Sequence, residues 1–159
     1  MTHKSHRIGV FAGTFRPFTL GHADVVKRAL AILDEVHICV GVNVAKPGEA
    51  HDAEERAAHI AALWSGSPRV KVTTWSGLTA DYAAKVGACC LLRSIRSVRD
   101  YEYERDMADY HLAACGLDTI LLCARPQLSF VSSSLVREMQ AMGKDPADYL
   151  PTPADCTFL

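Results

Sequence analysis

The sequence lacks the two glycine-rich patterns that most often bind nucleotide phosphates. Its 159 residues contain neither GxGxxG nor GxxxxGK[ST]. These absences exclude the dinucleotide-binding fingerprint and the P-loop. Any phosphate must therefore be bound by another arrangement of amides, hydroxyls and cations.

The chain also lacks an excess of charge and a long hydrophobic run. Its 17 lysines and arginines nearly balance 18 aspartates and glutamates, for a formal net charge of −1. This balance gives no overall field that would recruit nucleic acid or an anionic membrane. No apolar stretch reaches the ~18 residues of a membrane span, and the polar start "MTHKSHR" has no leader-like apolar core. We expect a cytoplasmic protein with neither a nucleic-acid nor a membrane partner.

The six cysteines include no CxxC pair, which argues against a zinc knuckle. Four of them lie inside apolar runs, which is typical of reduced, buried thiols in an intracellular protein. These four are Cys39, Cys89, Cys90 and Cys123.

Strand-like and helix-like patterns alternate along the whole chain. The strand segments are mostly continuous apolar runs, as parallel sheets require because both of their faces are covered. This alternation predicts an α/β protein with a Rossmann-like, doubly wound sheet of five parallel strands and helices on both faces. We expect one domain over 1–159, with 146–159 as a C-terminal tail or short helix. The expected strands are 7–12, 36–42, 69–75, 88–94 and 118–124, and the expected helices are 23–34, 52–64, 79–87, 98–115 and 133–142.

Polar side chains follow the predicted strands directly. In open α/β sheets, ligands bind beyond the carboxyl ends of the strands. A chain of net charge −1 that gathers cations at this edge is expected to bind polyphosphate there. The residues concerned are Thr14, Arg16, Asn43, Lys46, Thr79, Arg93, Arg96, Arg125, Ser129 and Ser132 to Ser134.

The first connection reads "AGTFRPFTLGH" and ends just before a helical pattern. Gly13 permits close backbone approach, and the helix start after Gly21 favours anions. His22 can donate a hydrogen bond to a phosphate oxygen from this place. Taken alone, the stretch is better explained by an ordinary surface turn, since turn glycines are common.

Two arginines, Arg93 and Arg96, leave a predicted buried strand three residues apart. Guanidinium groups match phosphate bidentately. A solvated charge run that pairs with Asp100, Glu102 and Glu104 is an equal alternative.

Three consecutive serines, Ser132 to Ser134, open the last predicted helix. Their hydroxyls and the first-turn amides can bind terminal phosphates, whereas simple N-capping needs only one serine. The run of three therefore favours a ligand. Lys46 is a single lysine in a predicted loop, and by itself it gives little evidence for a phosphate site.

Together these motifs resemble those of the phosphopantetheine adenylyltransferases, in the nucleotidylyltransferase superfamily. The family pattern reads "GSFDPxTxGH", "RGxRxxxDFEYE" and "xISSSxVRE", and this chain has "GTFRPFTLGH", "RSIRSVRDYEYE" and "FVSSSLVRE" in the same order. The resemblance covers essentially the whole chain, and Thr19 favours the pantetheine branch over the cytidylyltransferases. It implies that ATP and 4′-phosphopantetheine give dephospho-coenzyme A and pyrophosphate by direct in-line attack, with no covalent intermediate.

The resemblance also implies roles for individual residues. Thr14 and Lys46 would hold the attacking phosphate, and His22 would stabilise charge that develops on the α-phosphoryl group. Arg96 would bind the ATP phosphates. The implied catalytic residues are therefore His22, Thr14, Lys46 and Arg96. The implied phosphopantetheine-binding residues are Thr14, Lys46, Thr79 and Arg93. The implied ATP-binding residues are Thr14, Phe15, His22, Ser94, Ile95, Arg96, Glu104, Leu128, Ser129, Phe130, Val131, Ser132, Ser133 and Ser134.

By the same resemblance, Mg²⁺ would accompany ATP with no protein ligand assigned, coenzyme A would be a feedback inhibitor, and the chain would form a homohexamer. The chemistry suits these residues, because the nucleophile is already an anionic phosphate and needs no strong base. Catalysis then consists of positioning and charge neutralisation.

Three positions depart from the family pattern. Arg16 replaces an aspartate, Ser94 a glycine and Ala12 a proline. A cation at position 16 would either strengthen anion binding or remove a contact to magnesium or to a neighbouring cation. Serine at position 94 would be strained if the position needs a positive φ.

Two other functions stay open at this point. One is a nucleotidylyltransferase for another phosphate acceptor, such as nicotinamide mononucleotide or a polyol phosphate. The other is a degenerate nucleotide-binding module in which Arg16 has abolished turnover.

Overall fold

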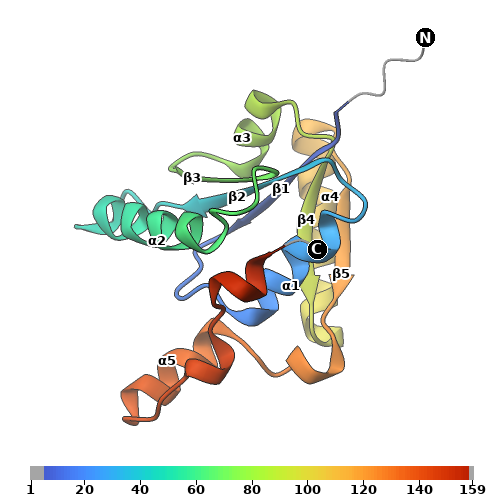
Figure 1. Cartoon of the computed structure of the whole chain (residues 1–159). Coiled ribbons are helices and arrows are strands. Elements are labelled where there is room, and N and C mark those ends of the chain that lie inside the picture. The colour runs from blue at the N-terminus through green and yellow to red at the C-terminus, as the bar shows by residue number, and fades with distance from the viewer. Residues whose placement is uncertain (1–5, 158–159) are drawn as a thin grey trace.

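Five parallel strands form one sheet in the computed structural model, which describes residues 6–157 (Figure 1). The strand order is β3-β2-β1-β4-β5, and each neighbouring pair runs parallel. The predicted five-stranded parallel sheet is therefore confirmed. The strands are β1 (Ile8–Gly13), β2 (Glu35–Gly41), β3 (Val70–Trp75), β4 (Cys90–Ile95) and β5 (Thr119–Cys123).

Helices cover both faces of the sheet, as predicted. Figure 1 shows α1 and α2 on one side and α3 and α4 on the other. A last helix, α5, follows β5. The helices are α1 (Leu20–Ala29), α2 (Glu49–Leu63), α3 (Thr79–Val86), α4 (Val98–Cys115) and α5 (Ser133–Ala141).

The strand side chains alternate between two hydrophobic cores because successive side chains point to opposite faces. Phe11 and Leu92 belong to the larger core, which includes residues of α1 and α2. Their neighbours Val10 and Leu91 pack with Ala83 of α3 in the smaller core. Continuous apolar runs were therefore needed to fill both cores.

Two helices begin earlier than the apolar pattern predicted. α1 begins at Leu20 rather than at 23, because Thr19 is its N-cap and His22 accepts the Thr19 backbone N–H. His22 thus lies in the first helical turn and not before it. α2 begins at Glu49 rather than at 52, after Gly48 in the left-handed conformation.

The C-terminal segment was expected to be a tail or a short helix. It forms two short 3₁₀ helices, η2 (Ala147–Tyr149) and η3 (Pro153–Cys156), while 158–159 lie outside the described residues. Cys156 is buried in the larger core, and η3 contacts α1 and α2. The short-helix alternative therefore describes this segment, and it helps to close the core.

The prediction of buried thiols was wrong for two of the four cysteines in apolar runs. Cys39 and Cys90 are buried, but Cys89 and Cys123 are exposed. Cys89 directly precedes β4, and Cys123 ends the edge strand β5. An apolar run does not show where its ends emerge from the core.

The strand order changes direction between β1 and β4, which lie next to each other in the sheet. Crevices at such a switch point bind ligands beyond the carboxyl ends of the strands. In residues 6–157, no helix has the length and apolarity needed to cross a membrane.

Candidate active site

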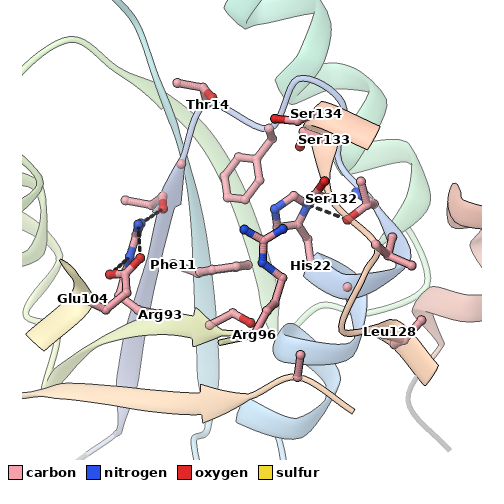
Figure 2. A pocket seen from close by; sticks show the side chains of 18 residues that line it. Phe11, Thr14, His22, Arg93, Arg96, Glu104, Leu128, Ser132, Ser133 and Ser134 are labelled. Carbon is pink, nitrogen blue, oxygen red and sulfur yellow. Dashed lines mark hydrogen bonds and ion pairs between the residues drawn. The ribbon is translucent and has the colours of Figure 1, made fainter. Parts of the chain in front are cut away.

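A cavity of about 270 Å³ opens beyond the adjacent ends of β1 and β4 (Figure 2). The turn after β1, the start of α1 and the start of α5 form its other walls. This is the sheet edge at which the sequence predicted a phosphate site.

The structure brings most of the predicted site residues to this cavity. Those that line it are Thr14, Phe15, His22, Arg93, Ser94, Arg96, Glu104, Leu128, Val131, Ser132, Ser133 and Ser134. Those that do not line it are Lys46, Thr79, Ile95, Ser129 and Phe130. Lys46 and Thr79 follow β2 and β3, which lie farther from the switch point.

Six lining residues were not among the predicted site residues: Phe11, Ala12, Gly13, Thr19, Gly21 and Ala124. Gly13, Thr19 and Gly21 lie in the family motif, and that motif was the available signal for these three. Phe11, Ala12 and Ala124 have apolar side chains that carry no chemical signal, so only their places at the ends of strands could have pointed to them.

His22 is held as a neutral ring with a defined tautomer. Its Nδ1 accepts the Thr19 backbone N–H at 2.9 Å and lies 3.1 Å from Thr19 Oγ1. A neutral imidazole that accepts at Nδ1 carries its proton on Nε2. Burial, and then the positive charges of Arg96 and Arg93, lower the pKa of His22 from its ordinary 6.5 to about 4. At neutral pH the ring is therefore an uncharged donor through Nε2–H.

The turn between β1 and α1 is built around the ring of Phe15. Its φ of 49° makes Phe15 the one non-glycine residue with positive φ among residues 6–157. The ring is buried and lies edge-on to His22 with centroids 5.1 Å apart, and it also contacts Phe18. A Cβ on Gly13 would come within 3.1 Å of this ring. A side chain at position 13 would therefore press on this ring, and the aromatic packing holds a conformation that a bulky residue rarely adopts.

Arg93 is fixed by a bidentate ion pair with Glu104. The Arg93 Nε and Nη2 atoms each donate to a Glu104 oxygen at 2.7 Å, and Nη1 donates to the Ala12 carbonyl at 2.8 Å. Because Glu104 is buried, its negative charge needs compensation, and this contact with Arg93 provides it. The fork of Arg93 is therefore oriented before any ligand arrives.

Arg96 projects from the end of β4 and lies close to His22 in Figure 2. Its backbone N–H and its Nε both donate to Asp100 at 3.0 Å. Ser94, between the two arginines, is not in the positive-φ region, so the strain considered for a serine at this position does not arise.

The three serines make three different contacts. Ser132 is the N-cap of α5, and its Oγ accepts the Leu135 N–H at 3.0 Å. Ser133 Oγ donates to the Pro17 carbonyl at 2.7 Å, and Ser134 Oγ accepts from Arg137 at 3.2 Å. Simple capping therefore explains Ser132 only, and all three line the cavity.

The cavity is suited to a polyanion. Arg93 and Arg96 line it, and α1 and α5 direct their N-terminal ends at it. Glu104 is the one carboxylate among the lining residues, and Arg93 neutralises it. Among the described residues, no group of three or more histidine, cysteine, aspartate or glutamate side chains could hold a metal ion.

Comparison with known proteins defines the class first. Residues 10–139 match the family described as cytidylyltransferase-like, which places the chain in that class. The fold resembles that of a bifunctional NMN adenylyltransferase/ADP ribose pyrophosphatase from Francisella tularensis, solved with AMP and a manganese ion. The TM-score is 0.65 at 16% identity, over 91% of this chain and 44% of the other. This likeness supports the fold alone.

Curated relatives then narrow the class. The chain is 49% identical over 144 residues to the phosphopantetheine adenylyltransferase of Porphyromonas gingivalis, covering 91% of this chain and 94% of the relative. It is 44% identical to that of Phocaeicola vulgatus over 145 residues, with coverage of 91% and 95%. The chain belongs to the phosphopantetheine adenylyltransferases, a family of nucleotidyltransferases, and the family predicted from its motifs is confirmed.

Proposed function

We propose that this chain transfers the adenylyl group of ATP to 4′-phosphopantetheine, which gives dephospho-coenzyme A and pyrophosphate. Its membership of the family supports this reaction. The observation that carries the mechanism is the neutral ring of His22, held with a donor at Nε2 beside two arginines.

The reaction needs one displacement at the α-phosphorus of ATP. An oxygen of the acceptor phosphate forms a new bond to the α-phosphorus. The bond from the α-phosphorus to the oxygen that bridges to the β-phosphate breaks, and the β- and γ-phosphates leave as pyrophosphate. No proton has to be removed from the nucleophile. His22 Nε2–H donates to a non-bridging oxygen of the α-phosphoryl group, where charge develops, without any change in its own charge. No covalent intermediate is required.

In this proposal the acceptor phosphate binds to Arg93 and Thr14, which both line the cavity. Thr14 supplies a hydroxyl from the turn, and Arg93 supplies a fork that Glu104 has already oriented. Lys46, from the β2–α2 connection, holds the acceptor phosphate together with Thr14, and Thr79, at the start of α3, contacts phosphopantetheine.

ATP binds in the same cavity. Arg96 and the start of α5 bind its phosphates, and the backbone of Phe15 faces them. In this proposal Glu104 also contacts ATP while its carboxylate is held by Arg93. The remaining ATP contacts proposed are Ser94, Ile95, Leu128, Ser129, Phe130, Val131, Ser132, Ser133 and Ser134.

Magnesium would enter with ATP. Mg²⁺ is commonly bound through substrate phosphates and water. The cavity is lined by arginines, serines and one paired carboxylate, which fits an ion whose ligands are ATP phosphates and water rather than protein side chains. When bound, the ion would neutralise charge on the β- and γ-phosphates. Arg96 and the amides of α5 would orient the same phosphates from the protein side.

Three further properties are proposed from the family resemblance alone. They are a homohexameric assembly, feedback inhibition by coenzyme A, and a cytoplasmic location. The geometry of the single chain described above does not depend on them.

Pyrophosphate release tests the proposed function. The purified protein with ATP and Mg²⁺ should release pyrophosphate on addition of 4′-phosphopantetheine, and not with nicotinamide mononucleotide or glycerol phosphate. Release with one of the other acceptors would make the chain a nucleotidylyltransferase of different specificity. ATP binding without release for any acceptor would indicate the degenerate module.

A further inference from the structure

A cluster of charges around one buried carboxylate lies beside the turn that carries Thr14. Glu49, the first residue of α2, is 4% exposed and forms ion pairs with Arg16 of the turn and with Arg56 of α2, the latter at 2.8 Å. Each oxygen of its carboxylate contacts one guanidinium group. A carboxylate buried to this degree needs such compensation.

Arg16 does not face the candidate active site. Its side chain lines a second hollow of about 470 Å³ on the α2 side of the turn, together with Arg56 and Arg137, and it is not among the residues that line the first cavity. Direct binding of substrate phosphates by this cation is therefore not the effect that the geometry supports. The structure instead shows Arg16 in an ion pair with Glu49, so the effect of Arg16 is expected to act through that contact.

Glu49 is joined directly to the loop of Lys46. The Glu49 backbone N–H donates to the Lys46 carbonyl at 3.3 Å, and the Lys46 N–H donates to the Asn43 carbonyl at 3.0 Å. Lys46 itself is exposed, and Gly48 turns the chain into α2 with a φ of 77°. The buried side chain of Glu49 thus connects an exposed loop to the turn of Arg16.

The same turn is held from α5 on its other side. Arg137 donates to the Arg16 carbonyl and, at 3.2 Å, to Ser134 Oγ, while Ser133 Oγ donates to the Pro17 carbonyl. The turn is therefore the place where the serine segment and the lysine loop are connected to each other.

We propose that Arg16 and Glu49 are positioning residues for adenylyl transfer. Their ion pair sets the loop of Lys46 against the turn of Thr14, so that both side chains hold one acceptor phosphate. This inference rests on the proposed function, because it assigns Lys46 to the acceptor. In this chain a cation at position 16 and a carboxylate at position 49 form the connection, although the family motif has aspartate at the first of these positions.

The test compares steady-state kinetics of Arg16→Ala, Glu49→Gln and Lys46→Ala. Arg16→Ala and Glu49→Gln should each raise the KM for phosphopantetheine about tenfold, since a misplaced binding group loses contact with its target. The KM for ATP should change less than twofold. Arg7→Ala is the matched control, because Arg7 forms an exposed ion pair with Asp34 away from the cavity, and its KM values should equal those of the wild type.

Coupling to Lys46 separates positioning from a general structural role. In a double-mutant cycle, Lys46→Ala should raise the KM for phosphopantetheine by a much smaller factor in the Arg16→Ala background than in the wild type. Equal costs in both backgrounds, or parallel losses for phosphopantetheine and ATP, would overturn the inference. Arg16→Lys, which keeps the charge without the fork, replaces Arg16→Ala in the cycle if circular dichroism shows that the alanine variant is unfolded.

Hydrogen exchange keeps this inference distinct from the proposed function. The backbone amides of Lys46 and Glu49 should exchange faster in Arg16→Ala than in the wild type, whichever acceptor the enzyme uses. Unchanged exchange at both amides would contradict the connection itself. A wild-type protein that releases no pyrophosphate with phosphopantetheine would instead contradict the proposed function.

Discussion

The histidine at the centre of the site shows what a motif can and cannot specify. The sequence predicted that His22 binds the α-phosphoryl group, since it ends a glycine-containing turn before a helix. Its tautomer and charge could not be predicted, because both depend on the Thr19 N–H, on burial and on arginines far along the chain. Likewise, the pairing of Arg93 with Glu104 was one of two alternatives until the contact was seen.

The titration of His22 is the first prediction at this scale. NMR of the imidazole carbons should give a pKa of about 4 for His22, well below the ordinary histidine value of 6.5. The pKa of His22 is lower in the folded chain than in the unfolded chain. At a pH between these two pKa values, the unfolded chain therefore binds more protons than the folded chain. The contribution of His22 to stability should therefore be complete above about pH 6.5 and decrease as the pH falls to about 4. A His22 pKa near 6.5 would contradict the neutral-donor assignment.

Replacement of His22 tests the role of this donor. His22→Ala should lower kcat by about 10²- to 10³-fold, because a preorganised donor to the transition state is lost. The Kd for ATP, measured by calorimetry, should change only a few-fold, since the contact strengthens as the reaction proceeds. Equal losses in turnover and ATP affinity would refute this role.

Loss of the Glu104 charge should destabilise the fold as well as the site. Glu104→Gln leaves the part-buried Arg93 without its charged partner and should cost about 2 kcal/mol of unfolding free energy, measured by urea denaturation. Asp100→Asn is the comparison, since the Arg96–Asp100 pair is more exposed and should cost about 0.5 kcal/mol or less. Equal effects of the two changes would show that the Arg93–Glu104 pair is not the stronger contact.

At the scale of elements, helix ends were harder to predict than helix cores. Apolar periodicity located the buried face of α1 but missed its first turn, where Thr19 and His22 cap each other through polar contacts. The start of α2 at Glu49 was missed because a glutamate is not expected to be buried. For α1 the missing information is a local polar contact, and for α2 it is the contact of Glu49 with Arg16 in a distant part of the chain.

The contact between α5 and the β1–α1 turn gives a prediction for elements. Ser133→Ala removes the hydrogen bond to the Pro17 carbonyl and should cost about 1 kcal/mol of stability, together with a weaker affinity for ATP. Thr157→Ala is the control, because its hydroxyl makes an exposed, local bond to the Ala154 carbonyl and should leave both values unchanged. Thermal unfolding and calorimetry measure the two effects. An unchanged ATP affinity for Ser133→Ala would separate this contact from the nucleotide side.

At the scale of the whole molecule, the fold was predictable because its cause is repeated along the chain. Five apolar runs alternate with helical patterns, and a parallel sheet covered on both faces is the arrangement that buries all of them. The strand order was not predictable, since it depends on how the connections cross the sheet. That order explains why Lys46 and Thr79 lie outside the cavity although they also follow strands.

The same order brings residues from distant segments to one switch point. The turn after β1, the end of β4 and the start of α5 converge there, so a chain of net charge −1 acquires a local site for polyanions. The site is thus a property of the complete fold rather than of any single motif.

The most direct test of the central claim is to identify and quantify both products of one reaction. With ATP, Mg²⁺ and 4′-phosphopantetheine, mass spectrometry and a pyrophosphate assay should detect dephospho-coenzyme A and pyrophosphate in equal amounts. His22→Ala, at the same concentration, should form both products far more slowly. Pyrophosphate without dephospho-coenzyme A, or no product while ATP is bound, would contradict adenylyl transfer to phosphopantetheine at this site.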